Sequence, residues 1–168
     1  MRLGDEVAWS NYLGMPSVIE HTSFPTPDVG SVRGWVERAV TAYSTNEGCR
    51  WALANPEDQL IGTCGFSSWS LAHGHAELVY DLDPQCQGRG LMSRAVEEVV
   101  RWVFAEQSIH RVHAFVMTSN EPSIGLLKRC GFGCEGTLRA FRIARGKPRD
   151  FYIYARLKSG QLRGASPN

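Results

Sequence analysis

The segment that most constrains the fold of this chain is a turn with two glycines, residues 83–90, that runs directly into a strongly amphipathic helix. Alternating apolar residues precede the turn and a second β-like run follows the helix, so the pattern predicts a β-turn-α-β unit. The first four N–H groups of a helix have no intrahelical partner, and the helix dipole adds partial positive charge there. Gly88 and Gly90 let an anion approach this backbone, which is typical of a phosphate site.

The glycine turn has the spacing Gln85-x-x-Gly88-x-Gly90. It resembles the acetyl-CoA pyrophosphate signature of the GNAT superfamily of N-acetyltransferases, Gln/Arg-x-x-Gly-x-Gly/Ala. Two other phosphate loops do not fit. A dinucleotide-binding loop needs Gly or Ala in place of Ser93 and an acidic residue about twenty positions further on, where His110 stands. No Walker A string occurs in the chain, so coenzyme A is the leading ligand.

The overall composition limits the class of protein. With 168 residues and 43% hydrophobic content we expect one domain over residues 1–157 and a flexible polar tail over 158–168. Lys and Arg number 18 against 17 Asp and Glu, which argues against nucleic acid bound through a broad basic face. No apolar run is long enough for a membrane span, and the N-terminus lacks the apolar core of a signal peptide. We therefore expect no membrane partner and a cytoplasmic location.

The cysteines argue against a metal or disulfide scaffold. They form an odd set of five without a C-x-x-C pair, namely Cys49, Cys64, Cys86, Cys130 and Cys134. This pattern is unlike a disulfide framework or a zinc ribbon and favours a reducing compartment. Cys64 with His73 and His75 would be a sparse metal cluster, and residues scattered over strands are more often packing or solvent-facing positions. The sequence therefore predicts no metal.

Periodicity predicts a mixed order of helices and strands. Helices are expected at 5–13 and at 90–106. Another helix is expected to begin after Asp28 or Ser31, either of which could cap it. The last helix is expected to run from Ser119 or Asn120 to 130, with a stop at Gly131. Strands are expected at 50–54, 60–69, 76–82, 111–116, 135–143 and 150–157. The large aromatic residues at positions 35, 43, 51 and 69 are assigned to the core. The order ααβββαβαββ predicts an α/β (α+β) fold, a mixed sheet flanked by helices.

A second motif extends the resemblance. Asn120-Glu121-Pro122-Ser123, with Gly131-Phe132 ending the following helix, resembles the RimJ/RimL-like branch of GNAT, the ribosomal-protein N-acetyltransferases. The match covers roughly residues 50 to 157. It implies the acyl-CoA N-acyltransferase fold with a mostly antiparallel sheet, and an N-terminal strand that is short or missing because only Arg2-Leu3 is available for it.

The resemblance implies acetyl-CoA as co-substrate and a set of residues that bind it. The strand before the glycine turn is expected to bulge at residues 80–82 and to direct backbone N–H groups toward the thioester and pantetheine. Asn120 is expected to hydrogen-bond the pantetheine arm; the alternative is that Asn120 and Ser123 are plain helix-start residues, with Asn120 as the N-cap. The expected coenzyme-binding residues are Tyr80, Asp81, Leu82, Gln87, Gly88, Arg89, Gly90, Leu91, Met92, Asn120 and Ser123.

Acetyl transfer to an amine needs a deprotonated amine, an oxyanion donor and a thiolate that can leave. Glu77 is the first candidate for the base, and its alternative is a solvent-facing strand residue. Ser123 is the candidate to protonate or solvate the sulfur. Many GNAT enzymes carry a tyrosine acid where this chain has Leu127, which excludes a tyrosine at that place. A thiolate with a pKa near 8.5 leaves readily, so the reaction does not require a tyrosine acid at this position.

The leading functional hypothesis is an acetyl-CoA-dependent N-acetyltransferase that acts by direct attack in a ternary complex. The amine acceptor is a protein N-terminus or a small molecule, and the sequence does not choose between them. The alternative is a CoA-binding sensor or interaction module without turnover, which the missing helix tyrosine motivates. Family resemblance is also compatible with a homodimer through the sheet edge or the final hairpin.

Overall fold

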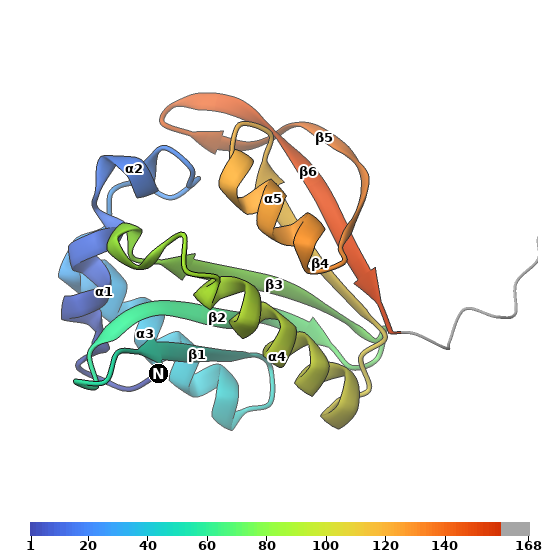
Figure 1. The fold of residues 1–168 in the computed structure, drawn as a ribbon, viewed down its shortest axis with the longest axis horizontal. Helices are drawn as coiled ribbons and strands as arrows, with labels where there is room; N and C mark the ends of the chain where they lie inside the picture. Colours follow the sequence, from blue (N-terminus) through green and yellow to red (C-terminus); the bar gives the residue numbers. More distant parts are fainter. Residues whose placement is uncertain (159–168) are drawn as a thin grey trace, which may run out of the picture.

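The computed structural model describes residues 1–158, so the tail predicted at 158–168 lies outside the described residues except for Lys158. Figure 1 shows one sheet between two sets of helices. The elements are α1 (Asp5–Leu13), α2 (Pro16–Ile19), α3 (Val29–Ser44), β1 (Cys49–Ala54), β2 (Leu60–Ser70), β3 (His75–Leu82), the 3₁₀ helix η1 (Pro84–Cys86), α4 (Leu91–Glu106), β4 (Arg111–Met117), α5 (Glu121–Arg129), β5 (Gly133–Ala144) and β6 (Lys147–Leu157). The predicted order is confirmed, with α2 added.

The sheet has six strands in the order β1-β2-β3-β4-β6-β5. Neighbouring strands are antiparallel except for β3 and β4. These two run parallel because α4 carries the chain back from the end of β3 to the start of β4. The parallel pairing is short: it joins His75–Glu77 to Arg111–His113 and then stops. Beyond these residues the two central strands diverge, as Figure 1 shows for the green β3 and the yellow β4.

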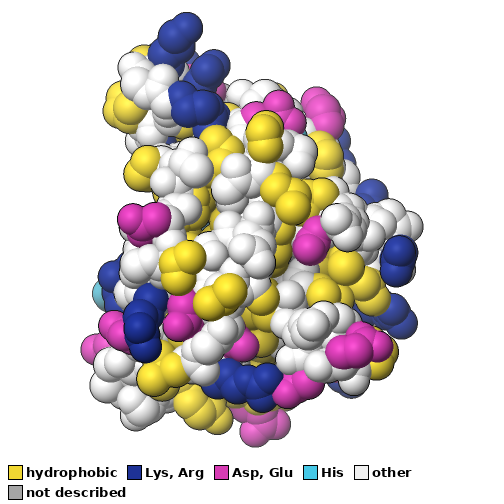
Figure 2. All heavy atoms as spheres, turned by 90° about the vertical axis from the view of Figure 1, so that its left-hand side faces the viewer, with side chains coloured by type: hydrophobic (Ala, Val, Ile, Leu, Met, Phe, Trp, Pro, Cys, Tyr) yellow, Lys and Arg dark blue, Asp and Glu magenta, His cyan; other side chains and the backbone are white. Residues whose placement is uncertain are grey.

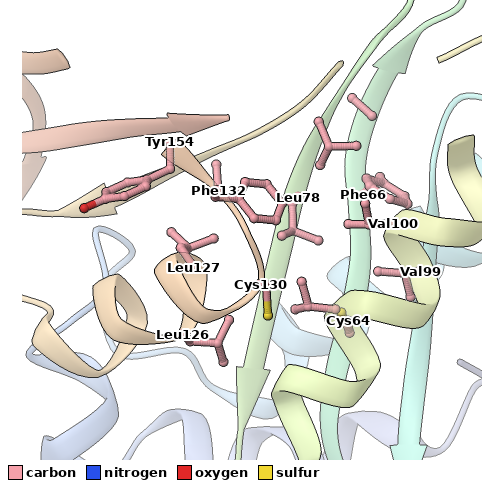
Figure 3. Packing of buried hydrophobic residues seen from close by; sticks show 14 of the residues in the cluster. Cys64, Phe66, Leu78, Val99, Val100, Leu126, Leu127, Cys130, Phe132 and Tyr154 are labelled. Atoms are coloured by element: carbon pink, nitrogen blue, oxygen red, sulfur yellow. The ribbon is translucent and has the colours of Figure 1, made fainter. Parts of the chain in front are cut away.

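Two hydrophobic clusters hold the helices on opposite faces of the sheet. The larger cluster lies between the sheet and the α4–α5 layer, and Figure 3 shows Phe66 and Leu78 of the sheet facing Val100 of α4 and Leu127 of α5. The smaller cluster joins Trp9 of α1 to α3 and the β1–β2 edge. Fully burying a side chain of this size contributes about 1.5–3 kcal/mol, so both layers are held firmly. None of the helices within residues 1–158 is long and apolar enough to cross a membrane.

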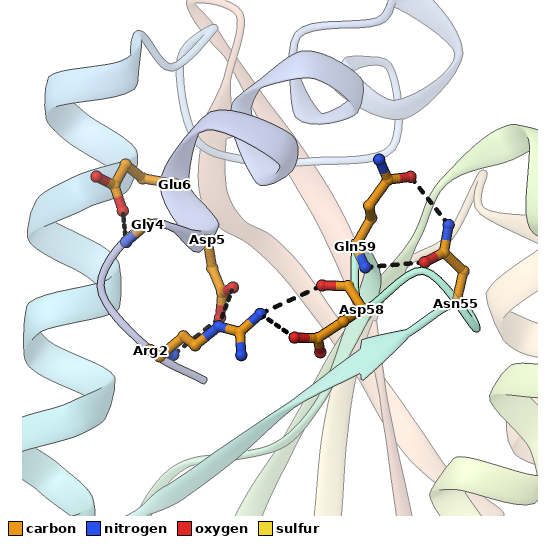
Figure 4. Close-up of polar contacts among 7 residues, drawn as sticks. All are labelled: Arg2, Gly4, Asp5, Glu6, Asn55, Asp58 and Gln59. Carbon is orange, nitrogen blue, oxygen red and sulfur yellow. Dashed lines mark hydrogen bonds and ion pairs between the residues drawn. The ribbon is translucent and has the colours of Figure 1, made fainter.

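The N-terminal residues 1–4 contain no strand, so the missing edge strand is confirmed and β1 forms this edge of the sheet. Polar contacts fix this segment instead. The Arg2 guanidinium donates to the Asp58 carboxylate at 2.6 Å and to its backbone oxygen at 3.2 Å, in the turn between β1 and β2 (Figure 4). Asn55 closes the same turn by accepting from the Gln59 N–H at 2.8 Å. The N-terminus is therefore anchored by side chains.

Helix α3 begins as predicted, with the Asp28 carboxylate accepting from the Ser31 N–H at 2.7 Å. Its predicted core face is only partly correct. Val36 is fully buried, but Tyr43 is 68% exposed, so its assignment to the core was wrong. The reason is length: α1 has nine residues and α3 has sixteen, so the last turns of α3 extend past the helix that covers its first turns.

Candidate functional site

The candidate site lies where β3 and β4 separate. The carboxyl ends of two parallel strands meet at one edge of the sheet, so the segments after Leu82 and Met117 leave from the same side and start α4 and α5 there. The gap between the strands opens into a cavity of about 350 Å³. Its walls include β3, β4, the start of α5, the β5–β6 hairpin, α1 and the segment after α2. Most of the predicted site residues converge on this edge.

The glycine turn has the backbone form expected of an anion site. Asp83 accepts from the Gln85 N–H at 2.9 Å and starts η1, after which Gly88 and Gly90 adopt φ of 75° and 71°. Such positive φ favours glycine. Gly90 is the N-cap of α4 and no side chain caps the helix, so the first N–H groups of α4 keep their donor capacity. The turn thus presents a row of backbone donors beside the positive end of a helix dipole.

The side chains around this turn have different tasks. Gln87 donates through Nε2 to the Leu82 backbone oxygen at 3.2 Å, which ties the turn to the end of β3. Met92 packs in the core, so only its backbone can contact a ligand. Arg89 is exposed beside the turn. Of the predicted coenzyme contacts on α4, backbone N–H groups are therefore the ones that the geometry favours.

The bulge predicted at residues 80–82 is wrong. These residues pair with β2 in regular register, and the irregularity of this strand pair lies at Ser67 in β2. The predicted consequence still follows from strand alternation. The Asp83 N–H donates to the Ile61 oxygen at 2.9 Å, so the N–H groups of alternate residues, Leu82 and Tyr80, point away from β2 into the gap. The divergence of β4 exposes the backbone donors that a bulge was expected to expose.

Tyr80 and Ser123 meet across the cavity. The Tyr80 hydroxyl and Ser123 Oγ form a hydrogen bond of 2.5 Å. Burial raises the pKa of Tyr80 above its usual range, and the hydrogen bond to Ser123 opposes this only in part, so Tyr80 stays protonated. Asn120 is the N-cap of α5 and accepts from the Ser123 N–H at 3.1 Å, which leaves its amide N–H₂ available. Leu127 is fully buried in the core.

Glu77 lies at the closed end of the gap, as the last β3 residue that pairs with β4. Its side chain is 24% exposed, lines the cavity and lies 3.5 Å from Nη2 of Arg142 on β5. His113 stands opposite Glu77 in the register. Burial lowers the pKa of the His113 imidazole, an effect that the Glu77 carboxylate partly opposes, so His113 is neutral at pH 7. The expectation of a purely solvent-facing Glu77 is not met.

Asp81 has a structural task that the sequence did not reveal. Its side chain leaves β3 on the face opposite to Tyr80 and accepts hydrogen bonds from Trp9 at 3.0 Å and from Tyr12 of α1. It also accepts from Thr63 at 2.7 Å and pairs with Arg50 at 2.5 Å. The Asp81 side chain therefore joins α1 to the sheet, and its backbone N–H, like that of Asp83, points toward β2 rather than into the gap.

The family model described as the acetyltransferase (GNAT) domain matches residues 1–133. The chain belongs to the GNAT family. A curated relative, the uncharacterized N-acetyltransferase p20 of Bacillus licheniformis, is 32% identical over 160 residues, which are 94% of this GNAT chain and 90% of the relative. The ribosomal protein uS5 alanine N-acetyltransferase of Escherichia coli is 35% identical over 107 residues, 62% of this chain and 55% of its own length. The RimJ/RimL-like resemblance is confirmed.

Solved structures share the fold of this GNAT domain. The ribosomal-protein-S5-alanine acetyltransferase of Vibrio fischeri has a TM-score of 0.84 and 23% sequence identity, and the match covers 95% of this chain and 91% of that one. Other structures with TM-scores of 0.78 to 0.82 hold acetyl-CoA or CoA, and one of these, a spermidine N-acetyltransferase, holds CoA together with spermine. The predicted α/β fold class is confirmed.

Sequence reasoning missed the hydrogen bond between two of the expected residues, Tyr80 and Ser123, and the place of Arg142 in this GNAT site. Nothing in the sequence pairs Tyr80 with Ser123, although strand alternation puts Tyr80 on the same face as the buried Leu78, beneath the helices. Arg142 was not considered a site residue because its place in the cavity depends on an irregularity in β5. The signal available in the sequence was weak, a single arginine in a hairpin rich in basic residues.

Proposed function

We propose that this GNAT domain transfers an acetyl group from acetyl-CoA to a primary amine by direct attack within a ternary complex. One observation carries the proposal: the gap between β3 and β4 joins the two faces of the sheet. On one face lie the uncapped start of α4 and the Tyr80–Ser123 pair, and on the other lies Glu77. A thioester from one side and an amine from the other meet in this gap.

The coenzyme is proposed to lie along the α4 side. Backbone N–H groups of Gly88, Gly90 and the first turn of α4 bind the pyrophosphate, and the Asn120 amide donates to the pantetheine arm. The N–H groups of Tyr80 and Leu82 that point into the gap reach the thioester region. The GNAT structures that hold acetyl-CoA or CoA support this assignment.

The chemical steps follow from the groups on each face. Glu77 takes a proton from the incoming ammonium, directly or through water, and the free amine attacks the thioester carbonyl. A backbone N–H of β3 stabilises the oxyanion. The carbon–sulfur bond breaks as the nitrogen gives up its second proton, and the Ser123 and Tyr80 hydroxyls relay that proton to the thiolate, so that both hydroxyls end the reaction protonated. The Tyr80–Ser123 pair thereby takes the place of the tyrosine acid that is missing at Leu127.

Family membership supports transfer over a sensor without turnover, because the curated relatives are N-acetyltransferases. Their names include acceptors of both expected kinds, a ribosomal-protein alanine and spermidine. We also propose a cytoplasmic location, which the five unpaired thiols favour because free cysteines persist in reducing compartments.

A matched pair of glycine variants tests coenzyme binding. Gly88 and Gly146 have φ of 75° and 70°, and a Cβ added at either meets no atom within 4 Å. Gly88→Val and Gly146→Val therefore carry the same backbone strain, but only Gly88 belongs to the proposed pyrophosphate site. Calorimetric titration with acetyl-CoA is expected to show loss of binding for Gly88→Val and wild-type affinity for Gly146→Val. Equal affinity in both variants would reject the site.

A further inference from the structure

The acceptor side of the cavity is small and largely aromatic. Its apolar wall includes Trp9, Phe24, Trp35, Phe115, Met117 and Phe151. Figure 2, which faces the α1 and α2 side of the molecule, shows hydrophobic side chains across the middle of this face, below a projecting tip with Lys and Arg. A volume of about 350 Å³ must hold the acceptor together with the reacting end of the coenzyme. The wall and the volume favour a small acceptor with an apolar body.

The charges of the cavity do not suit a polycation. Of the two acidic residues that line it, Asp81 is already bound by Trp9, Tyr12, Thr63 and Arg50. Among the described residues that line the cavity, Glu77 is therefore the carboxylate that can pair with an ammonium group. A polyamine carries several ammonium groups and needs a matching number of acidic partners, since a buried charge without a partner is costly. The cavity is therefore built for one ammonium.

Arg142 supplies a second charge beside Glu77. The three residues between Leu138 and Arg142 on β5 lie opposite a single residue of β6, Asp150, so β5 bulges here. Ala140 has a φ of 50° in this bulge, and its N–H donates to the Asp150 carboxylate at 2.7 Å. A non-glycine residue at positive φ costs energy and persists only when its surroundings fix it. The bulge places the Arg142 side chain in the wall of the cavity.

The Arg142 guanidinium retains hydrogen-bond capacity. It lies 5.1 to 5.5 Å from the ring centroids of Phe115, Phe141 and Phe151. Within residues 1–158 its ion-pair partner is Glu77, at 3.5 Å, and no side-chain hydrogen bond is formed. A guanidinium has five N–H donors in a fork that matches a carboxylate. The aromatic rings thus hold the fork in place and leave its donors for a ligand.

The two walls of the acceptor side are also tied together. Arg145, at the tip of the β5–β6 hairpin, donates to the backbone oxygens of Thr22 and Glu20 at 2.9 Å each. Thr22 belongs to the segment after α2 that lines the cavity, and the hairpin supplies Arg142 and Phe151 to it. This bridge restricts the space through which a polypeptide attached to the amine would leave.

We propose that the acceptor is a free α-amino acid with an apolar, aromatic side chain. In an α-amino acid one carbon separates the ammonium from the carboxylate, and the adjacent Glu77 and Arg142 offer the complementary pair of charges. The ammonium loses a proton to Glu77 and the nitrogen forms a bond to the acetyl carbon as the bond to sulfur breaks. The nitrogen gives up a second proton, which reaches the thiolate through the Ser123 hydroxyl, and the products are the N-acetyl amino acid and CoA. This proposal rests on the proposed function.

The test compares acceptors that differ in one group. Thiol release from acetyl-CoA is measured with L-phenylalanine, L-phenylalaninamide, spermidine and a peptide that begins with phenylalanine. Because a charge-assisted contact contributes about a tenfold preference or more, kcat/KM for phenylalanine is expected to exceed that for its amide by about that factor. Equal values for acid and amide, or a preference for spermidine or the peptide, would overturn the amino-acid assignment and leave acetyl transfer intact.

Variants of the hairpin assign the preference to Arg142. R142Q is expected to lower kcat/KM for phenylalanine about tenfold more than for phenylalaninamide, mainly through KM, and R142K to retain part of the preference. R149Q changes an exposed arginine on the same hairpin and is the matched control. A preference for the acid that survives R142Q would overturn the role of Arg142. Absence of thiol release with every amine would instead count against the proposed function itself.

Discussion

Replacement of Asp81 by asparagine is expected to destabilise the domain strongly, because one carboxylate joins three elements. Two donors converge on Oδ1, from Trp9 and Tyr12, and two on Oδ2, from Thr63 and Arg50. An asparagine keeps one acceptor oxygen and presents an N–H₂ group to the other two donors. The substitution therefore both removes a charge and opposes donor to donor.

The size of the effect follows from burial. The side chains of Asp81 and Arg50 are 14% and 22% exposed, so the pair is mostly but not fully removed from water. Removing one partner of a fully buried pair costs about 3–5 kcal/mol, and partial exposure reduces this. We therefore expect Asp81→Asn to lower the free energy of unfolding by about 3 kcal/mol. In a domain of this size each kcal/mol lowers Tm by about 2–4 °C, which gives a drop of about 6–12 °C.

Thermal unfolding of Asp81→Asn, followed by circular dichroism, measures this drop. The matched control is Asp58→Asn, which breaks the Arg2–Asp58 pair shown in Figure 4. The side chains of that pair are 63% and 70% exposed. Exposed pairs contribute little, so the control should keep the wild-type Tm within error. If the two variants lost the same stability, the role of Asp81 as the link between α1 and the sheet would be refuted.

Three further predictions concern other parts of the molecule. Tyr80→Phe removes the partner of Ser123 and is expected to lower kcat about tenfold without changing acetyl-CoA affinity, because the thiolate leaves readily; an unchanged kcat would dismiss the proton path. His113 has a pKa held by burial below its ordinary 6.5, so the unfolded chain binds a proton that the folded chain resists, and stability is lost as the pH falls below 6.5. His113→Gln should therefore show a smaller drop in Tm between pH 7 and pH 5 than the wild type, and an equal drop would contradict this account. Gly65→Ala would place a Cβ against a backbone carbonyl of β1 and is expected to lower the free energy of unfolding, measured by chemical denaturation, by about 3 kcal/mol or more. Gly136→Ala should lower it far less, because a Cβ at Gly136 meets no atom within 4 Å.

The elements with strong periodicity were predictable from the sequence. The helix from Leu91 to Glu106 and the alternating strands have patterns that only one structure satisfies, and Gly131 ends α5 at a φ of 75° as expected. Helix α2 was not predicted, because a single turn of four residues has no periodicity to detect. Tyr43 was wrongly assigned to the core. Its helical spacing predicts which face of α3 it lies on, but not that the covering helix α1 ends before it.

The conformation of the candidate site was predictable where backbone forms it and less so where side chains meet. The glycine turn is local, so its conformation follows from Gly88 and Gly90 alone. The contacts between Tyr80 and Ser123, and between Glu77 and Arg142, join residues 43 and 65 positions apart in the chain. They depend on the divergence of β3 from β4 and on the bulge in β5 at Ala140, which is not a glycine, and neither feature has a local signal. The bulge expected at residues 80–82 came from resemblance alone and was misplaced.

Acetyl transfer in the gap between β3 and β4 is the central claim, and multiple-turnover thiol release from acetyl-CoA tests it most directly. The assay uses the wild type and Glu77→Gln with a panel of N-terminal peptides, amino acids, polyamines and amine-bearing antibiotics, and mass spectrometry identifies the acetylated amine. We predict many turnovers with at least one acceptor class and a marked loss of kcat in Glu77→Gln. Tight acetyl-CoA binding without turnover on any amine, or full activity in Glu77→Gln, would contradict the account.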